Sequence, residues 1–291
     1  MKPAPFKYFR PESVEEIHYL LAEHGSEARI LAGGQSLVPL MNMRILQPGV
    51  LIDINRCRDL AYLRKEDGAV VCGALTRQGA AETDPAVAEH LPLLAAAMPH
   101  VGVRANRNFG TVCGSLAHAD PLGELPSVAS ALEARFVIAG ARGRREVGAD
   151  EFFVGALTNC LEPDEMLAEV RLPVSPPGAR SVFLEVANRA HGFAVGGLAA
   201  WAALDGRGRC VRARLSAMGA GSTTLRLRRA ESLLEGEALG EESIRAAAAA
   251  AVEAAEPSDD VHASAAYRAE LIGALVRKAL RRMLAPEGGP R

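Results

Sequence analysis

The stretch ARILAGGQSL at residues 28 to 37 decides the fold, because a short apolar strand runs straight into a glycine turn. A glycine pair lets the backbone adopt positive φ and approach a ligand closely, since no Cβ intervenes. Successive N–H groups in such a turn converge into an anion-binding nest, and a helix that starts after it adds unpaired N–H groups. We call residues 31–37, LAGGQSL, the first glycine segment and treat it as a candidate anion site.

The residues around this segment alternate between helix and strand patterns. PESVEEIHYLLAEHG at 11–25 has Ser13 as an N-cap with Glu16 three residues later, apolar residues at helical spacing, and Gly25 as a stop. SLVPLMNMRI predicts a brief helix or turn, and VLIDI at 50–54 predicts another strand. The order helix, strand, glycine turn, helical turn, strand is typical of an α/β unit.

GTVCGSL at residues 110–116, which we call the second glycine segment, has a similar pattern of glycines followed by a serine and a leucine. It lies within VRANRNFGTVCGSLAHADPLGELP at 103–126, where no helix or strand period fits. We therefore predict a long irregular stretch, of the kind that carries function in compact domains. Two nests from separate segments, with the hydroxyls of Ser36 and Ser115, can grip the two phosphates of one pyrophosphate, so a nucleotide cofactor is the expected occupant.

Simpler interpretations of these motifs stay open. The first segment is neither GxGxxG nor GxxxxGK[ST], and an isolated AGGxS is usually a turn that ends a strand. His118, Asp120 and Glu124 have the residue types of a metal or acid–base cluster, but Pro121 breaks any shared helical face. Capping by Asp120 and a favourable helix-dipole contact of Glu124 explain them as well, and Glu124 can also accept hydrogen bonds from a ribose or an adenine amine.

The rest of the chain divides at LPVSPPGAR, residues 172–180, which holds three prolines and a glycine. Beyond it, VFLEVAN, FAVGGLAAWAAL and RCVRARLSAMG predict three strands, and the remainder is helical. We therefore expect three units: residues 1–56, 57–175 and 178–286.

Composition excludes several classes of protein. The chain has 291 residues, a formal net charge of -2 and 49% hydrophobic residues, which gives no electrostatic case for nucleic acid binding. No apolar run is long enough to span a membrane, and the N-terminus does not resemble a secretory signal. The five cysteines are scattered without a CxxC pair, so we expect reduced thiols in the cytoplasm and neither a zinc site nor an iron–sulfur cluster in this chain.

With both glycine segments in view, the chain resembles the FAD-binding medium subunit of the molybdenum hydroxylases, the family of carbon monoxide dehydrogenase and the bacterial xanthine dehydrogenases. The resembling stretches are LAGGQSLVPLMNMR, RNFGTVCGSLAHADPLGELP and EVANRAHGFAVGG, in that order. The resemblance implies an α+β fold in which two α/β FAD-binding subdomains of the PCMH type hold FAD between them. A C-terminal three-stranded antiparallel sheet with a helical bundle would follow.

By position, the resemblance assigns FAD contacts to both segments and to residues after them. The first segment would wrap the pyrophosphate, the second would form an opposite wall, Glu124 would meet the adenosine side and Leu167 would pack near the flavin. No catalytic residue and no metal ligand is implied. The implied cofactor-binding residues are Ala32, Gly33, Gly34, Gln35, Ser36, Leu37, Thr111, Val112, Cys113, Gly114, Ser115, Ala119, Asp120, Glu124 and Leu167.

The chain departs from the family pattern at three places. Cys113 stands where glycine is more common, so the backbone there must suit a side chain. RAHGFA at 189–194 lacks an aspartate, and a lysine often found a few residues earlier is replaced by Glu185 or its neighbours.

The implied function is electron transfer in an oxidoreductase. Electrons from the 2Fe-2S centres of a small subunit, supplied by a molybdopterin-containing large subunit, would pass through FAD to an external acceptor. The resemblance also implies a dimer of heterotrimers. Two alternatives remain: a self-contained FAD-dependent oxidase with its own small organic substrate, and a non-enzymatic nucleotide-binding module, against which the intact glycines count.

Overall fold

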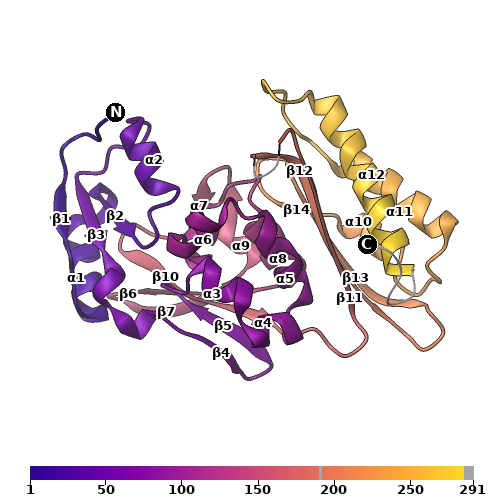
Figure 1. Ribbon diagram of the computed structural model, residues 1–291, viewed down its shortest axis with the longest axis horizontal. Helices are drawn as coiled ribbons and strands as arrows, with labels where there is room; N and C mark the ends of the chain where they lie inside the picture. The colour runs from indigo at the N-terminus through magenta and orange to yellow at the C-terminus, as the bar shows by residue number, and fades with distance from the viewer. Residues whose placement is uncertain (190–191, 285–291) are drawn as a thin grey trace.

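The structure, a computed structural model, describes residues 1–189 and 192–284. Figure 1 shows three parts in a row: an N-terminal part, a central part, and a C-terminal sheet with helices on its outer side. The mixed α/β character predicted from the sequence is confirmed. The residue boundaries proposed for the three units remain a prediction, and the last two residues of the third, 285 and 286, lie outside the described residues.

The N-terminal part is a small parallel sheet with two helices. Its strands follow the order β1-β3-β2, and both neighbouring pairs run parallel. The predicted capping of the first helix is confirmed, since Ser13 Oγ accepts a hydrogen bond from the Glu16 N–H at 3.2 Å; Glu16 in turn accepts from the Glu12 N–H at 2.8 Å. The elements are β1 (Lys7–Phe9), α1 (Val14–His24), β2 (Ala28–Leu31), α2 (Leu37–Asn42) and β3 (Val50–Asp53).

The central part is a five-stranded antiparallel sheet, order β4-β5-β10-β6-β7, with short helices packed against it. These helices lie between this sheet and the C-terminal sheet (Figure 1). The elements are β4 (Leu63–Glu66), β5 (Ala69–Gly73), α3 (Gln78–Thr83), α4 (Pro85–His90), α5 (Pro92–Ala97), α6 (Arg104–Phe109), α7 (Val112–His118), α8 (Glu124–Ala131), β6 (Arg135–Gly140), β7 (Gly143–Gly148), α9 (Ala149–Phe152), β8 (Phe153–Gly155), β9 (Thr158–Asn159) and β10 (Glu165–Pro173).

The prediction of an irregular stretch at 103–126 is wrong. It contains α6, α7 and the start of α8. Helices of six and seven residues make fewer than two turns, so a 3.6-residue period cannot show itself in their sequence.

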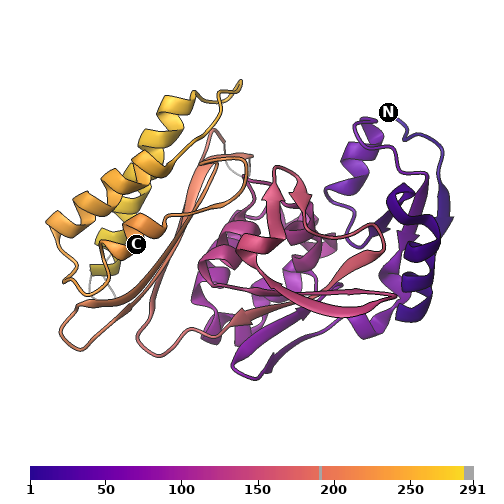
Figure 2. The same cartoon turned by 180° about the vertical axis from the view of Figure 1, so that it is seen from behind.

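The C-terminal part is a four-stranded antiparallel sheet, order β11-β12-β13-β14, covered on its outer face by helices (Figure 2). The prediction of three strands is therefore wrong: the fourth strand is only two residues long, too short for a strand pattern to show in the sequence. The elements are β11 (Arg180–Ala187), β12 (Ala194–Leu204), β13 (Cys210–Met218), β14 (Leu225–Arg226), α10 (Arg228–Ser232), α11 (Glu241–Ala254) and α12 (Ala265–Leu284).

This sheet is buried on both faces, which explains the continuous apolar run of β12. Phe183 and Trp201 belong to the core of the central part, whereas Leu184 and Leu198 belong to the core under α11 and α12. When both faces of a sheet are buried, its strands are apolar throughout and do not alternate between apolar and polar residues. None of the helices in residues 1–189 and 192–284 is long and apolar enough to cross a membrane.

Candidate functional site

The two glycine segments, far apart in the sequence, touch in the structure. A Cβ added at Gly33 would lie 2.4 Å from the Phe109 carbonyl oxygen and 2.7 Å from the Gly110 Cα. Asn106 Nδ2 also donates a hydrogen bond to Gln35 Oε1 at 2.8 Å. Glycine at position 33 is thus required by the approach of two backbones, and the N-terminal and central parts meet at this contact.

The first glycine segment is a turn with unused donors. Gly34 has φ +72°, the left-handed conformation that glycine adopts without a Cβ penalty. Its carbonyl accepts from the Val38 N–H at 3.0 Å, but within the described residues the N–H groups of 33–37 find no acceptor. Unpaired N–H groups on successive residues are suited to an anion, and the anion-binding role of this segment stays a prediction.

The second glycine segment differs from its prediction, because it is the capped start of α7. Thr111 Oγ1 accepts from the Gly114 N–H at 3.0 Å, and the Thr111 carbonyl accepts from the Ser115 N–H at 3.1 Å. The Val112 N–H donates to the Thr76 carbonyl at 2.9 Å. The segment is therefore a helix start and not the open turn that was predicted, and most of its donors are already used within the chain; its contact with a phosphate stays a prediction.

Cys113 fits this helix because its side chain faces inward. The thiol is buried and lies 3.5 Å and 3.6 Å from the carbonyl oxygens of Cys72 and Gly73. Burial raises the pKa of the Cys113 thiol well above its usual range. The departure from glycine is thus accommodated by ordinary helical backbone, and the thiol stays protonated inside the core of the central part.

The loop after α7 is held by a hydrogen bond from the β8–β9 turn and by a cap within the loop itself. Ala119 has φ +53°, ends α7, and its carbonyl accepts from the Leu157 N–H at 3.0 Å. Asp120 Oδ1 accepts from the Leu122 N–H at 2.9 Å, which is a local turn cap. Leu167 is 5% exposed within the central core, so its side chain offers almost no surface to a ligand.

Two carboxyl groups lie at the seam between the central helices and the C-terminal sheet. Burial raises the pKa of Glu124 to about 8, and the charges of Glu185 and Asp120 add to the shift. Burial also raises the pKa of Glu185 to about 7. Glu185 Oε2 lies 3.6 Å from His100 Nδ1 and finds no hydrogen-bond partner in the described part of the chain. In the sequence, Glu185 stands out only because it lies where the family pattern often has a lysine. Nothing in the sequence indicates that it is buried.

These shifts predict a pH-dependent stability. Both carboxyls have native pKa values above 4.5, so between about pH 4.5 and pH 8 the native state binds more protons than the unfolded state. The free energy of unfolding should therefore fall as pH rises through this window, by up to about 1.4 kcal/mol per pH unit and group. Urea unfolding at pH 5.5 and 8.5 measures this fall. Glu124→Gln should reduce this fall in the free energy of unfolding, and Glu253→Gln, at an exposed carboxyl, should leave it unchanged. An identical fall in the unaltered chain and in both variants would contradict the raised pKa of Glu124.

Two residues that the sequence analysis did not single out connect the segments. Asn55 follows β3, and its Nδ2 donates to the Ala32 carbonyl at 2.8 Å. Arg77 follows β5, and its Nη1 donates to the Phe109 carbonyl. In the sequence, only the position of each residue shortly after a strand could have indicated this role.

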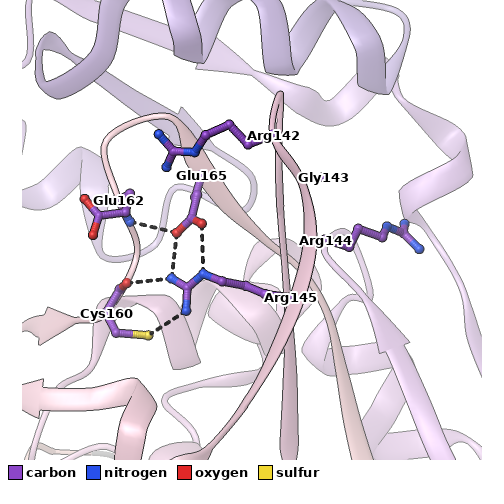
Figure 3. A pocket seen from close by; sticks show the side chains of 7 residues that line it. All are labelled: Arg142, Gly143, Arg144, Arg145, Cys160, Glu162 and Glu165. Atoms are coloured by element: carbon purple, nitrogen blue, oxygen red, sulfur yellow. Dashed lines mark hydrogen bonds and ion pairs between the residues drawn. The ribbon is translucent and has the colours of Figure 1, made fainter.

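No group of three or more His, Cys, Asp or Glu side chains in residues 1–189 and 192–284 is arranged to hold a metal ion. His191, in the RAHGFA stretch, lies outside the described residues. A pocket of about 400 Å³ lies at the β6–β7 hairpin (Figure 3), but Arg145 there is paired with Glu165 at 2.7 Å. Paired charges beside an edge strand are typical of protection against edge-to-edge association.

Comparisons with known proteins agree with this arrangement. A family described as the FAD binding domain in molybdopterin dehydrogenase matches residues 4–175, and one described as the CO dehydrogenase flavoprotein C-terminal domain matches residues 181–283. The chain is 41% identical over 284 residues to the 6-hydroxypseudooxynicotine dehydrogenase complex subunit alpha of Paenarthrobacter nicotinovorans, covering 98% of this chain and 96% of the relative.

Carbon monoxide dehydrogenase of Hydrogenophaga pseudoflava is similar in both sequence and structure. Its medium chain is 37% identical over 280 residues, covering 96% of this chain and 97% of that protein. A solved structure of this enzyme, which lacks the Mo-pyranopterin moiety of its cofactor, matches with a TM-score of 0.95 and 38% identity over 98% of this chain and 99% of that one.

Fold and segments together define a flavin-binding subunit of an oxidoreductase. The chain belongs to the family of FAD-binding medium subunits of molybdenum hydroxylases, to which carbon monoxide dehydrogenase belongs. The resemblance noted in the sequence is confirmed, and the function as a subunit of a molybdenum hydroxylase is favoured over that of a self-contained FAD-dependent oxidase.

Proposed function

We propose that the first glycine segment binds the diphosphate of FAD through its backbone N–H groups, with the second segment as the opposite wall. The unused donors at residues 33–37 are the observation that carries this proposal. A diphosphate needs several donors at close range, and backbone N–H groups supply them without a side chain intervening. The residues present therefore fit the cofactor that the family implies.

The two FAD-binding subdomains then correspond to the N-terminal and central parts, which meet at Gly33 and Gly110. We propose that Glu124 meets the adenosine side of FAD, and that Gly114 and Ser115, which are partly exposed, face the cofactor from the second wall. Five residues of the implied FAD-binding set are buried, so we propose that they support the second wall and contact FAD little. They are Thr111, Val112, Cys113, Ala119 and Leu167.

Bound FAD supplies the redox chemistry, and this chain binds and orients it. We propose that electrons reach the flavin from a 2Fe-2S small subunit served by a molybdopterin-containing large subunit, and leave to an external acceptor. The name of the 41%-identical relative, a subunit of a dehydrogenase complex, supports such partners. We further propose a dimer of heterotrimers located in the cytoplasm.

The visible spectrum of the purified chain tests this function. We expect a yellow protein carrying FAD, or a colourless one that takes up added FAD, and co-purification of molybdopterin and iron–sulfur partners when all subunits are expressed together. A chain that binds no FAD would refute the cofactor assignment, and turnover of an organic substrate by the isolated chain would favour an oxidase.

Gly34→Val tests the first segment. At φ +72° a β-branched residue is strained, and a Cβ would meet Leu31 and Val38 side-chain atoms at 3.1 and 3.2 Å. Left-handed strain of about 1–2 kcal/mol predicts a loss of FAD affinity of about 5- to 30-fold, measured by flavin fluorescence titration. Gly208→Val is the matched control, because Gly208 has φ +76° with nothing within 4 Å and lies in the remote β12–β13 hairpin. Equal FAD affinity of both variants would refute the assignment.

A further inference from the structure

Arg77 reaches out of the central part toward both glycine segments. Its backbone pairs with Thr111 in an isolated antiparallel bridge, which places it beside the second segment. Its Nη1 donates to the Phe109 carbonyl, immediately before that segment, and its Nη2 donates to Asn55 Oδ1 at 2.5 Å. One guanidinium thus joins the central part to the N-terminal part.

Asn55 continues this connection to the first segment. Its Nδ2 donates to the Ala32 carbonyl at 2.8 Å. The side chain is held from behind by Asp53, whose Oδ1 accepts from Asn55 Nδ2 at 2.6 Å and from the Asn55 N–H at 3.0 Å. Asp53 is 7% exposed and its Oδ2 accepts from the Tyr8 hydroxyl, so the anchor itself is fixed.

These bonds set the direction of the donors that face a ligand. The carbonyl of Ala32 and the N–H of Gly33 belong to one planar trans peptide and point in opposite directions. Because Asn55 holds the Ala32 carbonyl, it also aims the Gly33 N–H away from Asn55. Arg77 in the same way fixes the Phe109 carbonyl, which Gly33 touches.

We propose that Arg77 and Asn55 are positioning residues that fix the separation and orientation of the two glycine segments around FAD. The inference rests on the proposed function and adds residues that the cofactor need not touch. Hydrogen bonds from a charged guanidinium are stronger than neutral ones, and its rigid fork holds two acceptors at a set distance. The four-part connection Ala32–Asn55–Arg77–Phe109 therefore acts as one clasp between the two parts.

A double-mutant cycle on FAD affinity tests the clasp in the full-length chain. Arg77→Met and Asn55→Ala are each expected to raise the FAD dissociation constant about 10- to 50-fold, and the double variant by no more than the larger single effect. Residues that act through one another show such non-additivity. Flavin fluorescence titration gives the constants, and Arg135→Met, which removes an exposed pair with Glu146, should leave them unchanged.

Thermal unfolding of the FAD-free variants separates positioning from general stability. The melting temperatures should stay close to that of the unaltered chain, because both side chains lie at a partly exposed seam. Affinity lost in proportion to stability, additive effects in the cycle, or unchanged affinity in both single variants would each overturn the proposal. An unaltered chain that binds no FAD would instead refute the proposed function itself.

Discussion

Gly33→Ala is expected to separate the N-terminal and central parts and to abolish most FAD binding. The added Cβ would lie 2.4 Å from the Phe109 carbonyl oxygen and 2.7 Å from the Gly110 Cα, and both atoms belong to backbone that cannot rotate away. Overpacking of this kind costs about 3 kcal/mol, which corresponds to a loss of FAD affinity of roughly 100-fold. Flavin fluorescence titration measures the affinity and thermal unfolding measures the stability.

Gly206→Ala is the matched control for this variant. Gly206 lies in the β12–β13 hairpin, a Cβ there meets nothing within 4 Å, and its φ is not in the left-handed region. Its FAD affinity should equal that of the unaltered chain. Normal flavin content in Gly33→Ala together with an unchanged melting temperature would show that the two segments do not meet as described.

Arg226→Met is expected to have the largest effect on stability. Arg226 is nearly buried, and it donates to Glu231 at 2.8 and 2.9 Å and to the Ser130 carbonyl at 2.8 Å. Methionine keeps much of the volume but leaves the buried Glu231 carboxylate without its charged partner, with only the Leu215 N–H, among the described residues, still donating to it at 2.7 Å. Breaking one side of a buried pair costs about 3–5 kcal/mol.

The loss of stability should also weaken FAD binding, because Ser130 lies on α8, the helix that begins with Glu124. Urea unfolding measures the change in free energy. Arg229→Met removes an Arg–Glu pair at α10, the helix that carries Glu231, but Arg229 and Glu253 are largely exposed, so a change below about 1 kcal/mol is expected. Equal costs for the two variants would contradict the structural role given to Arg226.

The first glycine segment was predictable because its signals are local. Two glycines directly after a strand pattern indicate a turn, and Gly34 adopts the positive φ that the pair allows. The capping of α1 by Ser13 was readable for the same reason. Each of these features depends on residues within four positions of one another.

The long-range contacts of the second segment were not predictable, because the sequence does not display them. Thr111 caps α7 and pairs with Arg77 across a gap of 34 residues. Glu185 becomes buried only when α5 and the C-terminal sheet pack together. The clasp of Asn55 and Arg77 joins two parts of the chain, so neither residue carries a motif of its own.

The most direct test of the account is a comparison of FAD with riboflavin as ligands of the flavin-free chain. If the N–H groups of residues 33–37 hold a diphosphate, one FAD should bind per chain, and riboflavin, which lacks phosphate, should bind at least about 100-fold more weakly. Riboflavin binding as tight as that of FAD, or no uptake of FAD at all, would contradict the central claim.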